Sequence, residues 1–362
     1  MDRRFSLGSL KTGKAGLKKG TVTVEKSGIS IENDIKRKAE AEKIREVTGI
    51  QNDNDRIKYF FDAGVDSWYE TLKESTFASS FISFKSRDEI DALMSQNFRD
   101  ESVRKILSDL EQRLDRFIQE EHNGLAFVKL SSRSPKDSKI ILDKAAEEFH
   151  KATKSAQYTA MNDNDKWAAF SNEVRKACMV RSGEEALALL LNSERVFEDL
   201  KYASEYDGEE SVLDLIKVVV RSFDDRINTR NEFRGFVWNG KFVCVGQYFS
   251  KIYFPELNHL KERVASDFIK FFENKVAKSI QVPCFMMDLV WLDSGEVILV
   301  EINPFDGEEL GAFPASTGLF DWDKDRDLMT GKRPFEIRVL ESPVPNHIRT
   351  NGSGWTPYIY PK

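Results

Sequence analysis

The segment Phe285–Phe305, FMMDLVWLDSGEVILVEINPF, constrains this chain more than any other stretch. It predicts two strands joined at Asp293-Ser294-Gly295-Glu296, because glycine readily adopts the positive φ that a tight hairpin turn requires. With a two-residue Ser-Gly loop, Asp293 pairs with Glu296. The turn therefore sets the register of the whole hairpin, and Pro304 ends the pairing at its far end.

This register brings the acidic residues Asp288 and Glu301 together. Asn303 lies on the same face as Glu301, since side chains alternate along a strand. Directly opposed residues have Cβ atoms roughly 4.5–5.5 Å apart, so like charges there repel each other. Counting along the ladder gives these opposed pairs: Val290 with Leu299, and Asp288 with Glu301.

A divalent cation between Asp288 and Glu301 would turn this repulsion into attraction. With Asn303 the donors are all oxygen atoms, which suits magnesium rather than zinc. The alternative is that Asp288 is an exposed residue on a half-solvated sheet and that Glu301 is its accidental neighbour. A change of one residue in loop length would place the two carboxylates on opposite faces.

Composition narrows the class of protein. The 362 residues suffice for one large or two medium domains, and 40% hydrophobic with 31% charged residues is typical of a soluble protein. A net charge of −6 argues against a DNA-binding body, and no apolar run approaches the ~20 residues of a membrane helix. The three cysteines are far apart, which favours a reducing compartment, and we expect a cytoplasmic protein.

Helical periodicity interleaves with hairpin signals, so the expected fold class is α+β. Residues 1–56 are expected to form a disordered basic tail and a peripheral helix. Two subdomains are expected over 57–215 and 216–340, with the hairpin in the second, and 341–362 is expected to be an extended tail. The predicted elements are helices over 102–118, 145–156, 184–191 and 257–276, strands over 125–130 and 215–221, and a hairpin over 233–245 with an Asn239-Gly240 turn.

Cations occur at two unusual places near the middle of the chain. Lys129 lies inside the apolar strand FVKL, where a buried ammonium needs an anion. Lys136 follows in the turn Ser134-Pro135-Lys136-Asp137. These lysines are either a phosphate clamp or, for Lys129, a residue of an edge strand whose ammonium reaches solvent.

A third cation, Arg234, follows Asn231-Glu232 on the predicted hairpin. It is expected either to form an ion pair with Glu232 or to bind a phosphate through its planar fork. Together with the acidic hairpin, these cations form a nucleotide–magnesium pattern, in which the metal bridges phosphate oxygens. The chain has no GxxxxGK[ST] loop and no HRD or DFG motif, which excludes P-loop proteins and protein kinases.

An ordered series of segments resembles one known family. The segments are DSWYETLKESTFASSFI (Asp66–Ile82), FVKLSSRSPKDS (Phe127–Ser138), VRSGEEALALLLNSERVFEDL (Val180–Leu200), NEFRGFV (Asn231–Val237), FMMDLV, VEINPF and GLFDWDKD (Gly318–Asp325). The chain thereby resembles the cell division cycle protein 123 family, a divergent branch of the ATP-grasp fold. The resemblance implies two ATP-grasp subdomains with a nucleotide cleft between them.

The resemblance also implies site residues for ATP and magnesium. It implies phosphate contacts for Lys129, Lys136 and Arg234, magnesium ligation by Asp288, Glu301 and Asn303, and backbone contact to adenine from Val219 and Val220. The last two alternatively belong to the core. The chain departs from the family pattern at three places: Lys136 replaces an arginine, Glu301 replaces an aspartate, and Tyr248-Phe249 replaces an Arg-Asp pair after Gln247.

The family assembles eukaryotic translation initiation factor 2 by binding its gamma subunit. The resemblance therefore implies a monomeric ATP- and magnesium-binding assembly chaperone in translation initiation. The alternative is an ATP-grasp ligase or nucleotidyl transferase that modifies a protein or RNA, since fold alone does not settle function. Trp68, Tyr69 and Phe77 are candidates for an exposed partner surface, or else for the core.

Overall fold

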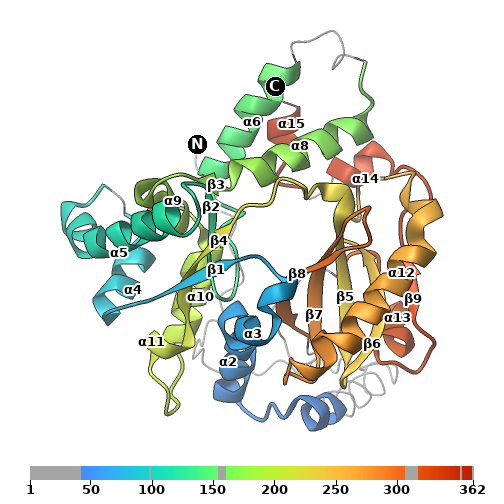
Figure 1. The fold of residues 1–362 in the computed structure, drawn as a ribbon, viewed down its shortest axis with the longest axis horizontal. Coiled ribbons are helices and arrows are strands. Elements are labelled where there is room, and N and C mark those ends of the chain that lie inside the picture. Colours follow the sequence, from blue (N-terminus) through green and yellow to red (C-terminus); the bar gives the residue numbers. More distant parts are fainter. Residues whose placement is uncertain (1–41, 98, 154–159, 306–316, 351–352, 361–362) are drawn as a thin grey trace, which may run out of the picture.

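A computed structural model describes residues 42–97, 99–153, 160–305, 317–350 and 353–360, which form two β-sheets flanked by helices (Figure 1). The expected α+β class is confirmed. The basic tail expected at the start of the chain lies outside the described residues. In the part of the chain described, we find no helix with the length and apolar character that crossing a membrane demands.

The first sheet has four strands in the order β1-β4-β2-β3, with every neighbouring pair antiparallel. The strands are β1 (Ser79–Ser83), β2 (Ala126–Leu130), β3 (Met179–Val180) and β4 (Lys217–Ser222). Strand β4 lies between β1 and β2 and is buried along most of its length. Its side chains alternate, so Val218 and Val220 face a core shared with helices, whereas Val219 and Arg221 face the second sheet.

Helices cover the outer face of the first sheet. The longest, α5 (Glu101–Glu120), follows the predicted periodicity, with a buried stripe of Val103, Leu107, Leu110, Leu114 and Ile118. Helices α6 (Lys139–Thr153) and α8 (Asp163–Ala177) project beyond the sheet and pack against each other (Figure 1). The other helices of this half are α4 (Arg87–Met94), α9 (Gly183–Leu191), α10 (Glu194–Ser204) and α11 (Val212–Leu215).

The second sheet has five strands in the order β8-β7-β5-β6-β9, and only β6 and β9 run parallel within it. They are β5 (Glu232–Trp238), β6 (Lys241–Gln247), β7 (Phe285–Trp291), β8 (Val297–Pro304) and β9 (Glu336–Arg338). The predicted Asn239-Gly240 turn is confirmed, since both residues have positive φ and Trp238 pairs with Lys241.

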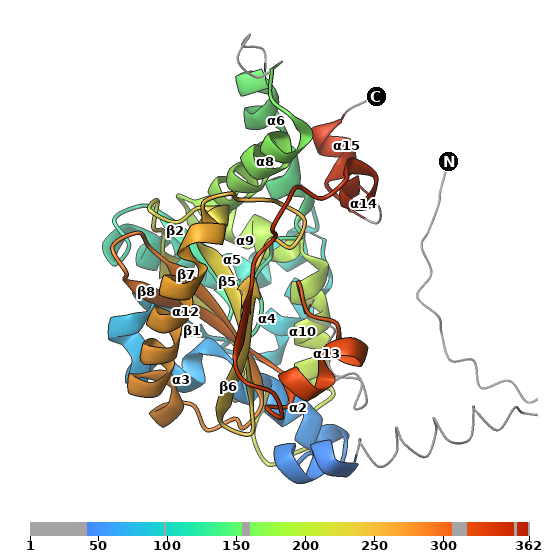
Figure 2. The ribbon, with the colours of Figure 1, turned by 90° about the vertical axis from the view of Figure 1, so that its right-hand side faces the viewer.

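Helix α12 (Leu257–Asn274) lies along the second sheet (Figures 1 and 2), where Phe268 meets Phe233 with ring centroids 5.2 Å apart. The early helices contribute Tyr59, Val65 and Trp68 to the core of this half. Phe60 and Phe61 belong to the core of the first sheet, so this early segment contacts both halves. The remaining elements are α2 (Asp53–Asp62), α3 (Val65–Leu72), α13 (Trp322–Met329) and the 3-10 turns η1 (Lys73–Ser75), η2 (Thr229–Asn231) and η3 (Val276–Lys278).

In the β7–β8 hairpin the two acids pair as predicted, but the loop length and the register near the loop differ from the prediction. The loop is one residue longer than predicted, because the Leu292 amide donates to the Glu296 carbonyl at 2.9 Å and Gly295 has φ of +90°. The predicted Val290–Leu299 pair is therefore wrong, and Leu299 pairs with Leu289. A β-bulge after Asp288 then inserts Val300, and Asp288 faces Glu301 as predicted.

Two expected boundaries differ from the structure. The division between residues 215 and 216 falls just before β4, which pairs with β1 and β2, so the change of sheet comes after Ser222. Residues 341–362, expected as an extended tail, contain the short helices α14 (Asn346–Thr350) and α15 (Thr356–Ile359). The rings of Trp355 and Tyr358 pack against Phe170 of α8, which accounts for the ordered segment.

A glycine fixes the close approach of α9 to α5. A Cβ on Gly183 would lie 2.1 Å from the backbone oxygen of Glu111, whereas one on Gly354 would meet nothing within 4 Å. We expect Gly183→Ala to lower the free energy of unfolding by about 1–3 kcal/mol, because the helices must separate. Urea unfolding monitored by circular dichroism measures this change, and Gly354→Ala is the control. Equal midpoints for the two variants would contradict the close packing.

Candidate functional site

Three charged side chains lie side by side on neighbouring strands of the second sheet. Arg234 of β5 is the ladder partner of Asp288 of β7, and Asp288 is the ladder partner of Glu301 of β8. Arg234 donates to Asp288 through two contacts, Nε–Oδ1 at 2.7 Å and Nη2–Oδ2 at 2.8 Å. Both side chains are buried, so this two-pronged ion pair is shielded from water.

The second carboxylate of this row is held from the other sheet. Lys129 of β2 donates to Glu301 with Nζ–Oε2 at 2.9 Å, and its ammonium also reaches the Ser132 carbonyl at 3.3 Å. The Lys129 side chain is only 1% exposed. Lys129 is therefore not the solvent-reaching edge lysine of the alternative interpretation, because β2 is an inner strand and its ammonium crosses to the second sheet.

The surrounding cations determine the charge of Glu301. Burial alone would raise the pKa of its carboxyl, but Lys129, Lys136 and Arg234 outweigh burial and hold that pKa well below its usual range. Burial lowers the pKa of Lys129, against the attraction of Glu301. The two acids predicted to repel each other are thus each neutralised by a cation, Asp288 by Arg234 and Glu301 by Lys129.

The donors predicted to hold magnesium lie together. The Asn303 amide nitrogen is 3.4 Å from Glu301 Oε1, so the amide shares the face of the two carboxylates. Among the described residues, no three His, Cys, Asp or Glu side chains gather to hold a metal. Two carboxylates and an amide oxygen suit a hard cation, but Arg234 and Lys129 already balance both acids. The site therefore fits magnesium that arrives with phosphate better than the bare ion.

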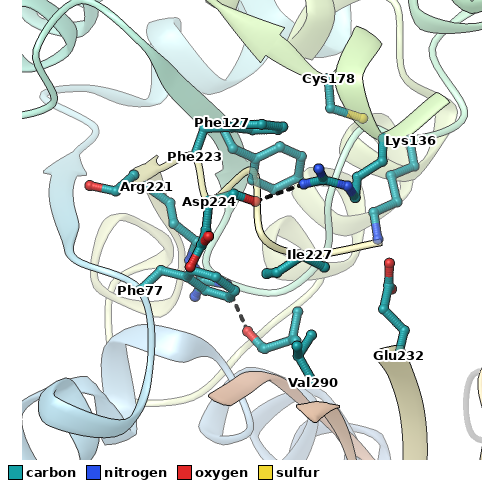
Figure 3. A pocket seen from close by; sticks show the side chains of 13 residues that line it. Phe77, Phe127, Lys136, Cys178, Arg221, Phe223, Asp224, Ile227, Glu232 and Val290 are labelled. Atoms are coloured by element: carbon teal, nitrogen blue, oxygen red, sulfur yellow. Dashed lines mark hydrogen bonds between the residues drawn. The ribbon is translucent and has the colours of Figure 1, made fainter. Parts of the chain in front are cut away.

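Lys136 approaches the same row from its turn. Its ammonium lies 6.0 Å from the centre of the Tyr248 ring, and the guanidinium of Arg234 lies 4.8 Å from that ring. Figure 3 shows Lys136 and Glu232 pointing toward one another. Burial opposes the charge of Lys136, but Glu232, Tyr248 and Glu301 outweigh it and raise the pKa of the lysine. Tyr248, whose ring lies near two cations, thus occupies the position at which the family pattern carries an arginine.

A cavity lies between the two sheets beside this row, and we call it the inter-sheet cavity (Figure 3). Its walls are mostly apolar, with three aromatic rings and three aliphatic side chains. The charged groups at its edge are Lys136, Arg175, Arg221, Asp224 and Glu232. The apolar lining residues are Phe77, Phe127, Phe223, Ile227, Val290 and Val300.

Sequence reasoning missed Arg221, which is 3% exposed and lines this cavity. It donates to the Val300 carbonyl at 2.7 Å and lies over the Phe77 ring, while its Nη2 is buried without a partner in the described structure. Burial lowers its pKa to about 10. The signal was present in the sequence, because Arg221, like Lys129, is a cation within an apolar strand.

Val219 and Val220 occupy a place that does not suit the expected adenine contact. Both lie in β4, which is paired with β1 on one side and β2 on the other. Their backbone groups therefore belong to the sheet ladder, and a base would find them already bonded. The chain leaves the sheet after Ser222, and Phe223 and Asp224 line the cavity instead.

The three aromatic residues that were candidates for an exposed partner surface or for the core do not form an exposed surface. Trp68 is 2% exposed and its indole donates to the Ala63 carbonyl, so the core alternative holds for Trp68. Tyr69 accepts a hydrogen bond from the Ser79 amide at 3.0 Å, and Phe77 lines the inter-sheet cavity. These rings support the packing around the site.

Comparisons with known proteins agree with one another. A family model described as D123 matches residues 158–353. A CDC123-like protein of Acanthamoeba polyphaga mimivirus is 24% identical over 300 residues, which cover 77% of this chain and 75% of that protein. The solved structure of Cdc123 from Schizosaccharomyces pombe matches with a TM-score of 0.52 and 19% identity, covering 77% of this chain and 96% of that one. Its C-terminally truncated form matches with a TM-score of 0.52 and 18% identity, covering 79% and 98%.

Proposed function

The chain belongs to the D123 family, and from this premise we propose that it binds ATP with magnesium between its two sheets, as an ATP-grasp-like protein. The observation that carries the proposal is the buried charged row. Arg234, Asp288 and Glu301 lie across three strands, and Lys129 reaches them from the opposite sheet. Cations from two sheets that meet beside an apolar cavity suit a ligand with a polyphosphate and a flat base.

The residues divide into three roles. Lys129, Lys136 and Arg234 would contact phosphate oxygens, because each presents N–H donors near the row. Asp288, Glu301 and Asn303 would hold magnesium, which when bound neutralises phosphate charge. The base would lie at the inter-sheet cavity against Phe127 and Phe223, in place of the contact expected from Val219 and Val220. The free volume of this cavity is about 80 Å³, so it would have to widen to admit the base.

This proposal predicts metal-dependent binding. Calorimetry should show that the wild type binds ATP in the presence of magnesium, and Asp288→Asn or Glu301→Gln should weaken that binding. The loss of one charge-assisted contact costs about 1.5–3 kcal/mol, which is roughly ten- to a hundredfold in affinity. The absence of heat and of a thermal shift with the wild type would overturn the proposal.

Magnesium alone is a useful control. Because Lys129 and Arg234 already balance both carboxylates, magnesium chloride without nucleotide should leave the melting temperature nearly unchanged. A large shift with the bare ion would mean that the metal displaces these cations without help from phosphate. For the Asp288→Asn and Glu301→Gln variants, Glu198→Gln is a matched control, because this partly exposed acid pairs with Arg133 away from the row.

We further propose that the chain is an assembly chaperone for eukaryotic translation initiation factor 2 and acts on its gamma subunit. The support is family membership, together with the resemblance of the segments from Asp66 to Asp325. Mixing the purified proteins, with and without ATP and magnesium, and measuring the mass of the complex tests this. No complex at micromolar concentration would favour the ligase or nucleotidyl transferase alternative, which an ATP-dependent mass change on another protein or RNA would reveal.

A further inference from the structure

A second cavity, which we call the side chamber, lies across Lys136 from the inter-sheet cavity. Its free volume is about 370 Å³, within the range of small-molecule sites. Lys136, Arg175, Cys178 and Glu232 line both cavities. A molecule in the side chamber would therefore touch the same lysine that the proposed function assigns to the nucleotide phosphates.

The charged groups of the side chamber favour an anion. Three cations, Lys136, Arg175 and Arg195, line it against two acids, Asp137 and Glu232. The carboxylate of Asp137 is already occupied, because it accepts from the Ser193 hydroxyl at 2.6 Å and from the Arg195 amide at 3.1 Å.

Two guanidinium groups in the side chamber retain donors. Arg175 donates to the Asp224 carbonyl at 2.9 Å, but its Nε is buried and has no partner in the described structure. The guanidinium of Arg195 forms no ion pair or hydrogen bond with any described residue, and it is exposed to the chamber mouth. A buried donor without an acceptor is costly, and an anion would satisfy it.

Part of the wall of the side chamber is aromatic. Tyr248 and Phe249 meet with ring centroids 5.2 Å apart, and Phe249 lies 6.4 Å from Trp355. These rings come from the segment after β6 and from the C-terminal segment, and all three line the chamber. They offer aromatic faces and edges to the body of a ligand whose charged end meets the arginines.

We propose that the side chamber binds a small organic anion, a carboxylate or phosphate carried on a flat apolar body, next to the nucleotide. That the neighbouring ligand is a nucleotide rests on the proposed function. The anion in the side chamber is inferred from the donors and rings of the chamber itself. Lys136 is shared by both ligands, so the two would meet at its ammonium.

Calorimetry with three simple probes tests this proposal. Phenyl phosphate and 3-phenylpropionate carry the two anions, and 3-phenyl-1-propanol is the neutral control. Each probe is titrated into the full chain twice, once without nucleotide and once with saturating ATP and magnesium. We expect at least one anion to bind in both conditions and the alcohol to bind at least tenfold more weakly. The anion that binds tells a carboxylate ligand from a phosphate ligand.

Arg195→Gln should weaken anion binding about tenfold through the loss of one charge-assisted contact. Arg181→Gln is the matched control, because Arg181 is exposed and lies outside the chamber. The proposal would be overturned if the alcohol bound as well as the anions, or if the two variants bound the anion with equal affinity. It would also be overturned if neither anion bound at about 10 mM, or if ATP displaced the anion. Anion binding by a protein that fails to bind ATP would overturn the proposed function and leave the chamber assignment standing.

Discussion

Lys129→Met is expected to lower the free energy of unfolding by about 3–5 kcal/mol, because it leaves the half-buried carboxylate of Glu301 without its partner. Methionine is close to lysine in volume, so the loss measures charge rather than a cavity. The sequence alone suggested a ligand phosphate as the anion that this buried ammonium needs. The 2.9 Å contact to Glu301 changes that expectation. Urea unfolding measures the difference.

A double variant separates the structural role from the binding role. Lys129→Met with Glu301→Gln removes both charges of the pair, so most of the lost stability should return. Nucleotide binding should not return, because the proposed phosphate and metal contacts are both gone. Lys73→Met is the control, since its exposed pair with Glu70 contributes little. If Lys129→Met is as stable as Lys73→Met, the pair does not hold the two sheets together.

The same pair makes a definite contribution to acid stability. The pKa of Glu301 is held below its unfolded value of about 4.3, so the stabilisation is fully present above that pH and is lost as the pH falls further. Wild-type stability should therefore decline on acidification more steeply than that of the double variant. Parallel declines from pH 6 to pH 3, a window set by roughly that value, would show that folding does not lower the pKa of Glu301.

Arg234→Met should be the second most damaging change, with a loss of about 3–5 kcal/mol from the unpaired Asp288. Arg234→Lys keeps the positive charge but gives up the two-pronged contact, so it should retain more stability than methionine while still weakening nucleotide binding. Unfolding and calorimetry on both variants check this. Equal stability for Arg234→Met and wild type would mean that the ion pair with Asp288 gives no net stabilisation.

The sequence predicted the pairing of Asp288 with Glu301 for a partly wrong reason. The expected loop was one residue too short, which by itself would have placed the acids on opposite faces. The bulge at Val300 adds a second residue and restores the pairing. Local turn preferences favour a loop length, but a bulge depends on packing across the sheet, which a single segment does not encode.

The predicted cations have partners that no local pattern reveals. Lys129 and Glu301 are 172 residues apart in the sequence, and they meet because the two sheets face each other. Arg221 was interpreted only as the last residue of the predicted strand over 215–221, although a cation in an apolar strand was the same signal that singled out Lys129. The apolar run Val218–Val220 correctly predicted a central strand, but it did not indicate which sheet that strand joins.

The position of β4 has a consequence for the synthesis of this chain. Strands β1 and β2 do not pair with each other, and both depend on β4, whose Arg221 faces Ser79. As the polypeptide leaves the ribosome, the first sheet must wait until residue 222 has emerged before it can close. A fragment ending at residue 215 would contain β1, β2 and β3 but not β4, the strand that lies between β1 and β2. Most of the helices around that sheet are made earlier, so they would remain without a completed core during elongation.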